Sequence, residues 1–215
     1  MRVVKEAEER RNEILDVADE LFRKKGFDGT STNDILDIVG IARGTLYYHF
    51  KSKLEILDAL VDRYSERLLK NAQTIAAEKD IPVNERMVQV IKSLNISGGS
   101  GSKIIEQLHK PQNALMHQKM QRAMLTGVTP ILAEIIEEGI TEGIYETAYP
   151  YECMEMAMAY GSVVLDDGMI EQKPDERMTR IQAFIYNLER LLGIANGTLA
   201  KDVLRIFYDS KDEQE

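Results

Sequence analysis

The segment that most constrains the fold is STNDILDIVGIARGTLYYHFKSK, residues 31–53. Apolar residues at helical spacing predict one short helix over residues 32–39 and a second over residues 43–49. Gly40 falls between them, at a corner where the absence of a Cβ makes a left-handed backbone accessible. Two helices joined by a short glycine turn predict a helix-turn-helix motif.

The second helix of such a motif enters the DNA major groove, and its outward residues suit that role. Leu46 and Phe50 are expected to face inward, which leaves polar and aromatic side chains outside. Arg43 can donate two hydrogen bonds to a guanine edge, and Thr45 can contact a base or a thymine methyl group. Gly44 permits a phosphate to approach closely. The remaining donors for phosphate oxygens are Tyr47, Tyr48, His49, Lys51 and Lys53.

Residues 26–53 resemble the DNA-binding domain of the TetR family of bacterial repressors, and the block GTLYYHFKSK (44–53) is close to that family's signature. The resemblance implies DNA contacts from Thr32, Arg43, Gly44, Thr45, Tyr47, Tyr48, His49 and Lys53. One position departs from the pattern, because Ala42 stands where the family usually has Ser or a similar cap for the recognition helix. Loss of a cap costs about 1 kcal/mol.

An alternative interpretation treats the aromatic residues at 47, 48 and 50 as ordinary core residues and the two lysines as a solvated helix start. The occurrence of glycines, tyrosines, a histidine and lysines together at fixed offsets favours DNA binding instead. His49 alone is left open between a phosphate donor and a packed structural histidine.

Charge and cysteine content limit the class of protein. The chain has 215 residues, a net charge of −9 and a single cysteine, Cys153, which excludes an internal disulfide framework and fits a reducing cytoplasm. Residues 1–55 hold ten Lys and Arg against eleven Asp and Glu, so most of the negative charge lies further along. A local basic and aromatic face is sufficient for groove binding. No apolar run is long enough to span a bilayer, and no secretory segment is found, so we expect a cytoplasmic protein.

The remaining chain predicts an all-α fold, with no strand pattern. A first helix over 6–25 completes a three-helix DNA-binding domain, residues 1–53. A larger helical domain for effector binding and dimerisation is expected over 54–208, followed by a charged tail, 209–215. Its expected helices span 52–79, 82–94, 104–110, 113–144, 150–167, 175–192 and 198–208. Pro130 either kinks the fourth of these or begins a new helix.

The resemblance also implies a homodimer in which the helices over 150–167 and 175–192 pair with their copies in a four-helix bundle. The alternative is that both helices pack only within one subunit. Small residues at Ala157 and Gly161 would allow helices to approach closely.

Methionines in the middle of the chain predict an adaptable apolar interior that can bind a small, largely apolar effector. The candidate effector-binding residues are His109, Met116, His117, Met120 and Met124. His109 and His117 stand eight residues apart without ligand spacing, so no metal or other cofactor is predicted. No Ser-His-Asp order or nucleophile elbow is present, and no catalysis is expected. Cys153 is interpreted as a buried thiol, with redox sensing left open.

Together these features predict a ligand-responsive DNA-binding regulator, a repressor that binds a palindromic operator as a homodimer. The alternative class is a small-molecule-binding or scaffold protein with a vestigial DNA-binding head.

Overall fold

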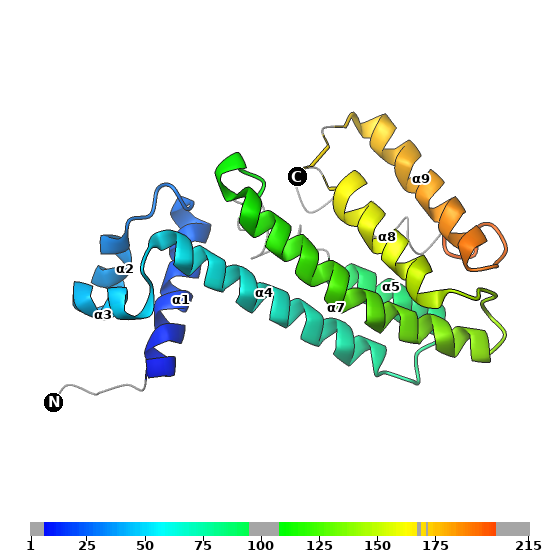
Figure 1. Cartoon of the computed structure of the whole chain (residues 1–215), viewed down its shortest axis with the longest axis horizontal. Coiled ribbons are helices and arrows are strands. Elements are labelled where there is room, and N and C mark those ends of the chain that lie inside the picture. The colour runs from blue at the N-terminus through cyan, green and yellow to red at the C-terminus, as the bar shows by residue number, and fades with distance from the viewer. Residues whose placement is uncertain (1–6, 95–107, 167–168, 171, 201–215) are drawn as a thin grey trace.

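The computed structural model describes residues 7–94, 108–166, 169–170 and 172–200, and within these ranges the chain is all-α, as predicted (Figure 1). The helices are α1 (Ala7–Lys25), α2 (Thr32–Val39), α3 (Arg43–His49), α4 (Lys53–Ala76), α5 (Val83–Leu94), α7 (Ala114–Thr141), α8 (Pro150–Val164) and α9 (Pro174–Leu191), with a 3₁₀ segment, η1 (Pro111–Asn113), before α7. The expected loop at 95–103, most of the helix at 104–110, most of the helix at 198–208 and the charged tail lie outside the described residues.

The first three helices and the start of α4 enclose one hydrophobic core. The apolar stripe of α1 is buried, with Ile14 and Phe22 at most 1% exposed. It packs against Ile35 of α2 and Leu46 of α3. We call α1–α3 the head, and the helices from α5 onward the body.

Local capping fixes the corner between α2 and α3. Ser31 caps α2 by accepting a hydrogen bond from the amide of Asp34, and the Asp34 carboxylate accepts one from the Ser31 amide in return. The Ser31 hydroxyl also donates to the Asp34 carboxylate, and this bond, with those from the Ser31 amide and from Lys25, holds the pKa of Asp34 well below its usual range. Gly40 ends α2 in the left-handed conformation at φ 70° and donates its N–H to the Leu36 carbonyl.

Helix α4 joins head and body and belongs to the cores of both. Ile56, Leu60 and Tyr64 are buried in the head core, whereas Ala72 is buried in the body core. The head core therefore extends past the expected boundary at residue 53. Figure 1 shows α4 lying alongside α7 between the two ends of the molecule.

Helix α7 runs unbroken from Ala114 to Thr141, so no new helix begins at Pro130. Near its end, Glu138 binds the deeply buried Arg86 of α5 with both carboxylate oxygens, at 2.5 and 3.0 Å. Arg86 also donates to the Ala76 carbonyl at the end of α4. This ion pair therefore links α4, α5 and α7 at the end of the molecule far from the head. Among the described residues, no helix is both long and apolar enough to cross a membrane.

We expect Glu138→Gln to lower the free energy of unfolding at pH 7 by about 2–3 kcal/mol, because it leaves the buried Arg86 guanidinium without its charged partner. Hydrogen bonds from Arg86 and Lys79 lower the pKa of Glu138 from 4.5 to about 2. The contribution of the ionised carboxylate is therefore complete above about pH 5 and is lost as the pH falls toward 2. Urea unfolding should show the difference between wild type and variant shrinking over that range. Glu137→Gln changes an exposed carboxylate on the same helix and is the matched control; an equal loss from both would contradict this role.

Candidate nucleic-acid interface

Helix α3 is held on one side by the head core and is open on the other. Leu46 and Phe50 are each 1% exposed, whereas Tyr48 is 73% and Tyr47 37% exposed. The C-terminal end of α3 is fixed by Arg11, which donates to the His49 carbonyl at 3.2 Å and lies over the Phe50 ring at 4.2 Å. The outward-facing residues of α3 from Arg43 to Tyr48, which we call the outward row, are therefore held in a fixed orientation by the head core.

Arg43 begins α3 and is exposed, with its guanidinium 5.9 Å from the centroid of the Tyr47 ring. This distance lies at the edge of the range for a cation–π contact. The aromatic face orients the guanidinium without using its N–H groups, which remain donors for a base edge or a phosphate. Thr45, two residues further along α3, is half-buried.

The N-terminal end of α3 is accessible and has no side-chain cap. Ala42 occupies the cap position and makes no capping hydrogen bond, as the departure from the family pattern predicted. A Cβ at Gly44 would meet no described atom within 4 Å outside its own helix backbone and its two chain neighbours. The surface beside Gly44 at the start of α3 is therefore open, so that a phosphate group could approach the backbone there.

His49 lies at the end of α3, half-buried, with its ring 5.0 Å from that of Tyr48 in an edge-to-face arrangement. Burial, together with the guanidinium groups of Arg11 and Arg10, lowers its pKa below the usual 6.5. The imidazole is therefore mainly neutral at pH 7 and offers one N–H rather than a positive charge. Its assignment as a phosphate donor stays a prediction.

Lys53 and Lys51 differ in their surroundings. The Lys53 ammonium donates to the carbonyls of Phe27 (2.6 Å) and Thr30 (2.8 Å) and stands 4.3 Å from the centre of the Phe27 ring. It thus secures the loop between α1 and α2, with at most one N–H left for a phosphate. Lys51 is exposed and donates to the Tyr47 carbonyl at 3.1 Å. The family resemblance implied a DNA contact from Lys53 and not from Lys51. The carbonyls that Lys53 binds lie more than twenty positions away, so its role in securing this loop could not be found from local sequence.

Thr32 is the first residue of α2 and is half-exposed. Its predicted contact to DNA remains untested, like those of the α3 residues.

The candidate effector residues occupy two different environments. Met116 and Met120 are buried in the head core, and Met124 packs against both cores. Ser65 of α4 donates to the Met120 sulfur at 3.0 Å. These methionines thus fill the junction between α4 and α7.

The two candidate histidines lie together, although the chain separates them by eight residues. Their ring centroids are 4.9 Å apart, and each Nε2 faces one oxygen of Asp166, at 3.1 Å for His109 and 3.0 Å for His117. Asp166 lies about fifty positions further along the chain, so sequence spacing does not group it with the two histidines.

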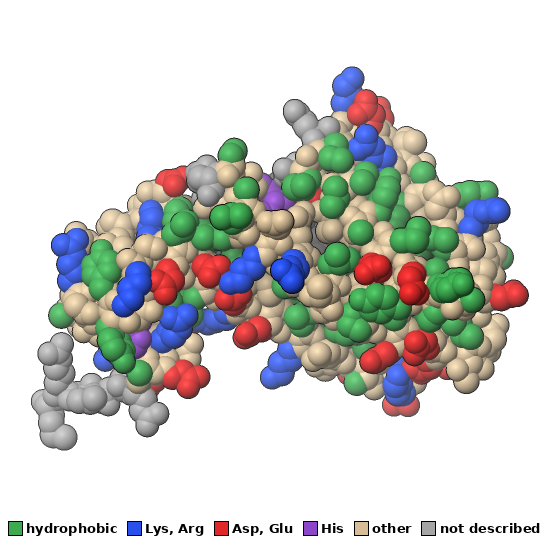
Figure 2. Space-filling model, in the orientation of Figure 1, with side chains coloured by type: hydrophobic (Ala, Val, Ile, Leu, Met, Phe, Trp, Pro, Cys, Tyr) green, Lys and Arg blue, Asp and Glu red, His purple; other side chains and the backbone are tan. Residues whose placement is uncertain are grey.

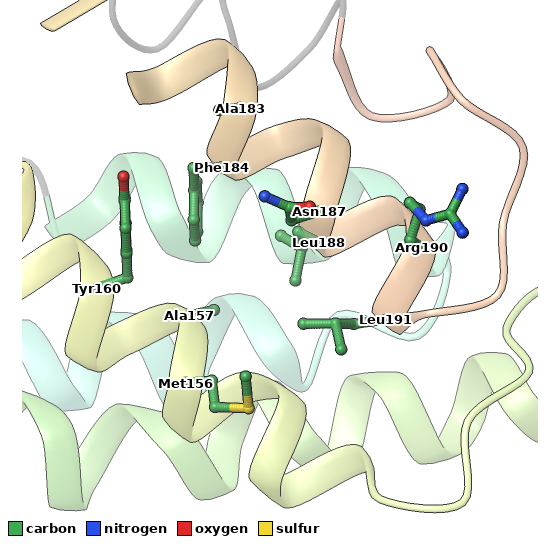
Figure 3. A pocket seen from close by; sticks show the side chains of 9 residues that line it. All are labelled: Met156, Ala157, Tyr160, Ala183, Phe184, Asn187, Leu188, Arg190 and Leu191. Atoms are coloured by element: carbon green, nitrogen blue, oxygen red, sulfur yellow. The ribbon is translucent and has the colours of Figure 1, made fainter. Parts of the chain in front are cut away.

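A groove of about 500 Å³ lies between α8 and α9 (Figure 3). Met156 and Ala157 of α8 face Leu188 and Leu191 of α9 across it, and the rings of Tyr160 and Phe184 stack with centroids 5.2 Å apart. The groove is mostly apolar. Cys153, in the first turn of α8, is buried and free, with its sulfur near the Thr147 hydroxyl.

A short helix that presents arginine and tyrosines from a three-helix head defines a DNA-binding protein of the helix-turn-helix class. Comparison with known proteins agrees. Residues 14–60 match the family model for bacterial regulatory proteins of the tetR family, and residues 98–186 match that for a tetracycline repressor-like C-terminal domain. The chain belongs to the TetR family and is a transcriptional regulator.

Individual relatives extend this result. The chain is 29% identical over 154 residues to the HTH-type transcriptional regulator TtgR of Pseudomonas putida. The matched region covers 66% of this chain and 73% of TtgR. It is 38% identical over 68 residues to the HTH-type transcriptional repressor KstR2 of Rhodococcus jostii, 32% of this chain and 33% of KstR2. The structure of SmeT, the repressor of the Stenotrophomonas maltophilia multidrug efflux pump SmeDEF, has the same fold, with a TM-score of 0.60 at 21% identity over 88% of this chain and 95% of SmeT.

We expect Gly44→Ala to leave the fold intact or stabilise it by up to about 1 kcal/mol, because alanine is the better helix former and the added methyl group meets nothing. The same methyl group should obstruct a phosphate at the start of α3 and weaken DNA binding. Thermal unfolding and a DNA-binding titration of one preparation test both parts. Unchanged DNA affinity in a normally folded variant would contradict a phosphate contact at this end of α3.

Proposed function

We propose that this regulator is a repressor that binds a palindromic operator as a homodimer and is released when a small effector occupies its body. The observation that carries the proposal is the outward row of α3, which the buried Leu46 and Phe50 hold in one orientation. The similarity to KstR2, a repressor by name, supports repression as the mode of action.

Within the outward row we assign two tasks. Arg43 and Thr45 read bases, because the guanidinium can pair with a guanine edge and the threonine can contact a thymine methyl group. Tyr47, Tyr48 and the amides near Gly44 bind phosphates and set the register of the helix in the groove. Lys51 adds a charged phosphate contact at the end of the row.

A homodimer is supported by the surface of α8 and α9. Met156 is 57%, Tyr186 47% and Leu191 40% exposed, and Figure 2 shows apolar side chains gathered over these two helices. Such a patch is typical of a protein–protein interface. Pairing of α8 and α9 with their copies would cover the groove between them and place two heads about a twofold axis. Two heads related by that axis require a palindromic site.

Coupling between effector and DNA is supported by α4, because its two halves lie in different cores. An effector that shifts α4 relative to the body changes the separation of the two heads. A difference of 1–3 kcal/mol between the two arrangements would change operator affinity about 5- to 150-fold.

Selection of bound duplexes from a random pool, with the full chain at near-physiological salt, tests the function. We expect a palindrome with a fixed half-site spacing. A folded, dimeric protein that enriches no sequence would favour the alternative class, a small-molecule-binding or scaffold protein with a vestigial head.

Separate alanine substitutions of Arg43 and Lys51 test whether one residue reads bases and the other binds phosphate. We expect Arg43→Ala to cost about 1–3 kcal/mol on the selected operator and to relax base preference at one position of each half-site. The matched control Lys51→Ala should weaken binding to all duplexes by a similar factor. It should also reduce the salt dependence of the binding constant by about one phosphate contact. Binding titrations on the operator and on single-base variants measure both effects. The same change in base preference from both variants would contradict the assignment.

A further inference from the structure

The cluster formed by His109, His117 and Asp166 is a preformed donor set for a metal ion. One atom from each side chain lies within 4.8 Å of the other two. Both Nε2 atoms face the same carboxylate, at 3.1 and 3.0 Å. Donors bound to one tetrahedral Zn²⁺ at about 2.0–2.1 Å are separated by about 3.3 Å. Each nitrogen is already close to this separation from one of the two carboxylate oxygens, and the three donor atoms, all within 4.8 Å of one another, need only draw closer together to surround an ion.

We propose that these three residues bind a divalent transition-metal ion, with Zn²⁺ the best match, and that this ion acts on the regulator proposed above. Two imidazoles and a carboxylate suit Zn²⁺, Co²⁺ and Ni²⁺, whereas Mg²⁺ and Ca²⁺ prefer all-oxygen sites. Three protein ligands leave a further position on the ion for water or for an oxygen or nitrogen of a small molecule.

The position of the cluster allows an ion to enter. His109 is 28% and Asp166 17% exposed, while His117 is largely buried at 11%. The single thiol of the chain, Cys153, lies in the first turn of α8, whereas Asp166 follows the end of that helix. The thirteen positions from Cys153 to Asp166 correspond to about 20 Å at the helical rise of about 1.5 Å per residue, so the site has nitrogen and oxygen donors without sulfur.

The three ligands come from parts of the chain that the regulator would have to couple. Asp166 follows α8, which we assign to the dimer interface. His109 lies between Leu108, which is buried in the head core, and Lys110, which binds Asp28 of the head at 2.8 Å. His117 is on α7, next to the buried Met116.

An ion would therefore fix the end of α8 to a segment that is anchored in the head. A bound ion stabilises whichever head arrangement gives the better ligand geometry, and operator affinity changes accordingly. This second part rests on the proposed function, whereas metal binding itself does not.

The first experiment measures metal binding directly. The full chain without a histidine tag is stripped of metal and titrated with Zn²⁺ by calorimetry, and Co²⁺ is added separately to record its visible absorption. We expect one ion per chain, and a visible Co²⁺ spectrum typical of a four-coordinate rather than a six-coordinate ion. His117→Ala and Asp166→Asn should each weaken Zn²⁺ binding at least about 10-fold.

The control for these variants is Glu155→Gln, which neutralises an exposed carboxylate on α8 and should bind Zn²⁺ like wild type. Circular dichroism and the oligomeric state confirm that each variant is folded, and Asp166→Asn is conservative enough to serve if His117→Ala is not. Failure of wild type to bind, or equal binding by wild type and both ligand variants, would overturn the site.

The second experiment measures operator affinity with and without Zn²⁺. We expect a change of about 5- to 150-fold in wild type and in Glu155→Gln, and none in Asp166→Asn. Zn²⁺ binding without any such change overturns the regulatory part and leaves a structural metal site. If the protein binds Zn²⁺ but selects no DNA sequence, the proposed function is contradicted and the metal site is retained. If it selects a DNA sequence but does not bind Zn²⁺, only the metal site is overturned.

Discussion

The packing of α4 into two cores is the constraint on which the rest of the molecule depends. Its first half contributes Ile56, Leu60 and Tyr64 to the head, and its second half contributes Ala72 to the body. Because protein interiors are close-packed, neither core can move along this helix without repacking the other. The far end of α4 is held by Arg86, which donates to the Ala76 carbonyl while paired with an acid of α7. The orientation of the head is thus set over the full length of one helix.

A second connection runs parallel to the first. Leu108, Met116 and Met120 are buried among head residues, although they lie just before and at the start of α7, a helix of the body. Lys110 adds an ion pair with Asp28 at the loop after α1. The head is therefore held both by α4 and by the start of α7, and a ligand that shifts one relative to the other reorients it. The proposed metal site lies within this second connection.

The DNA-facing helix is short and depends on its surroundings. Seven residues without a side-chain cap would not form a stable helix alone, since isolated short helices are marginal in water. Burial of Leu46 and Phe50 supplies the missing stability, and Arg11 satisfies a carbonyl at the C-terminal end. The recognition face carries few charges and belongs to an acidic protein. The DNA binding that we propose for this surface would therefore depend on local geometry rather than on net charge.

The sequence by itself determined the helices of the head, because their limits follow from local chemistry. Gly40 ends α2 by its left-handed backbone, and the apolar period of α1 selects its buried face. Only the tertiary structure decided that Lys53 supports a loop, that the methionines of α7 fill the head core, and that His117 meets Asp166. These contacts join residues more than twenty positions apart. Local periodicity in the sequence cannot predict such contacts, because they depend on how whole helices pack.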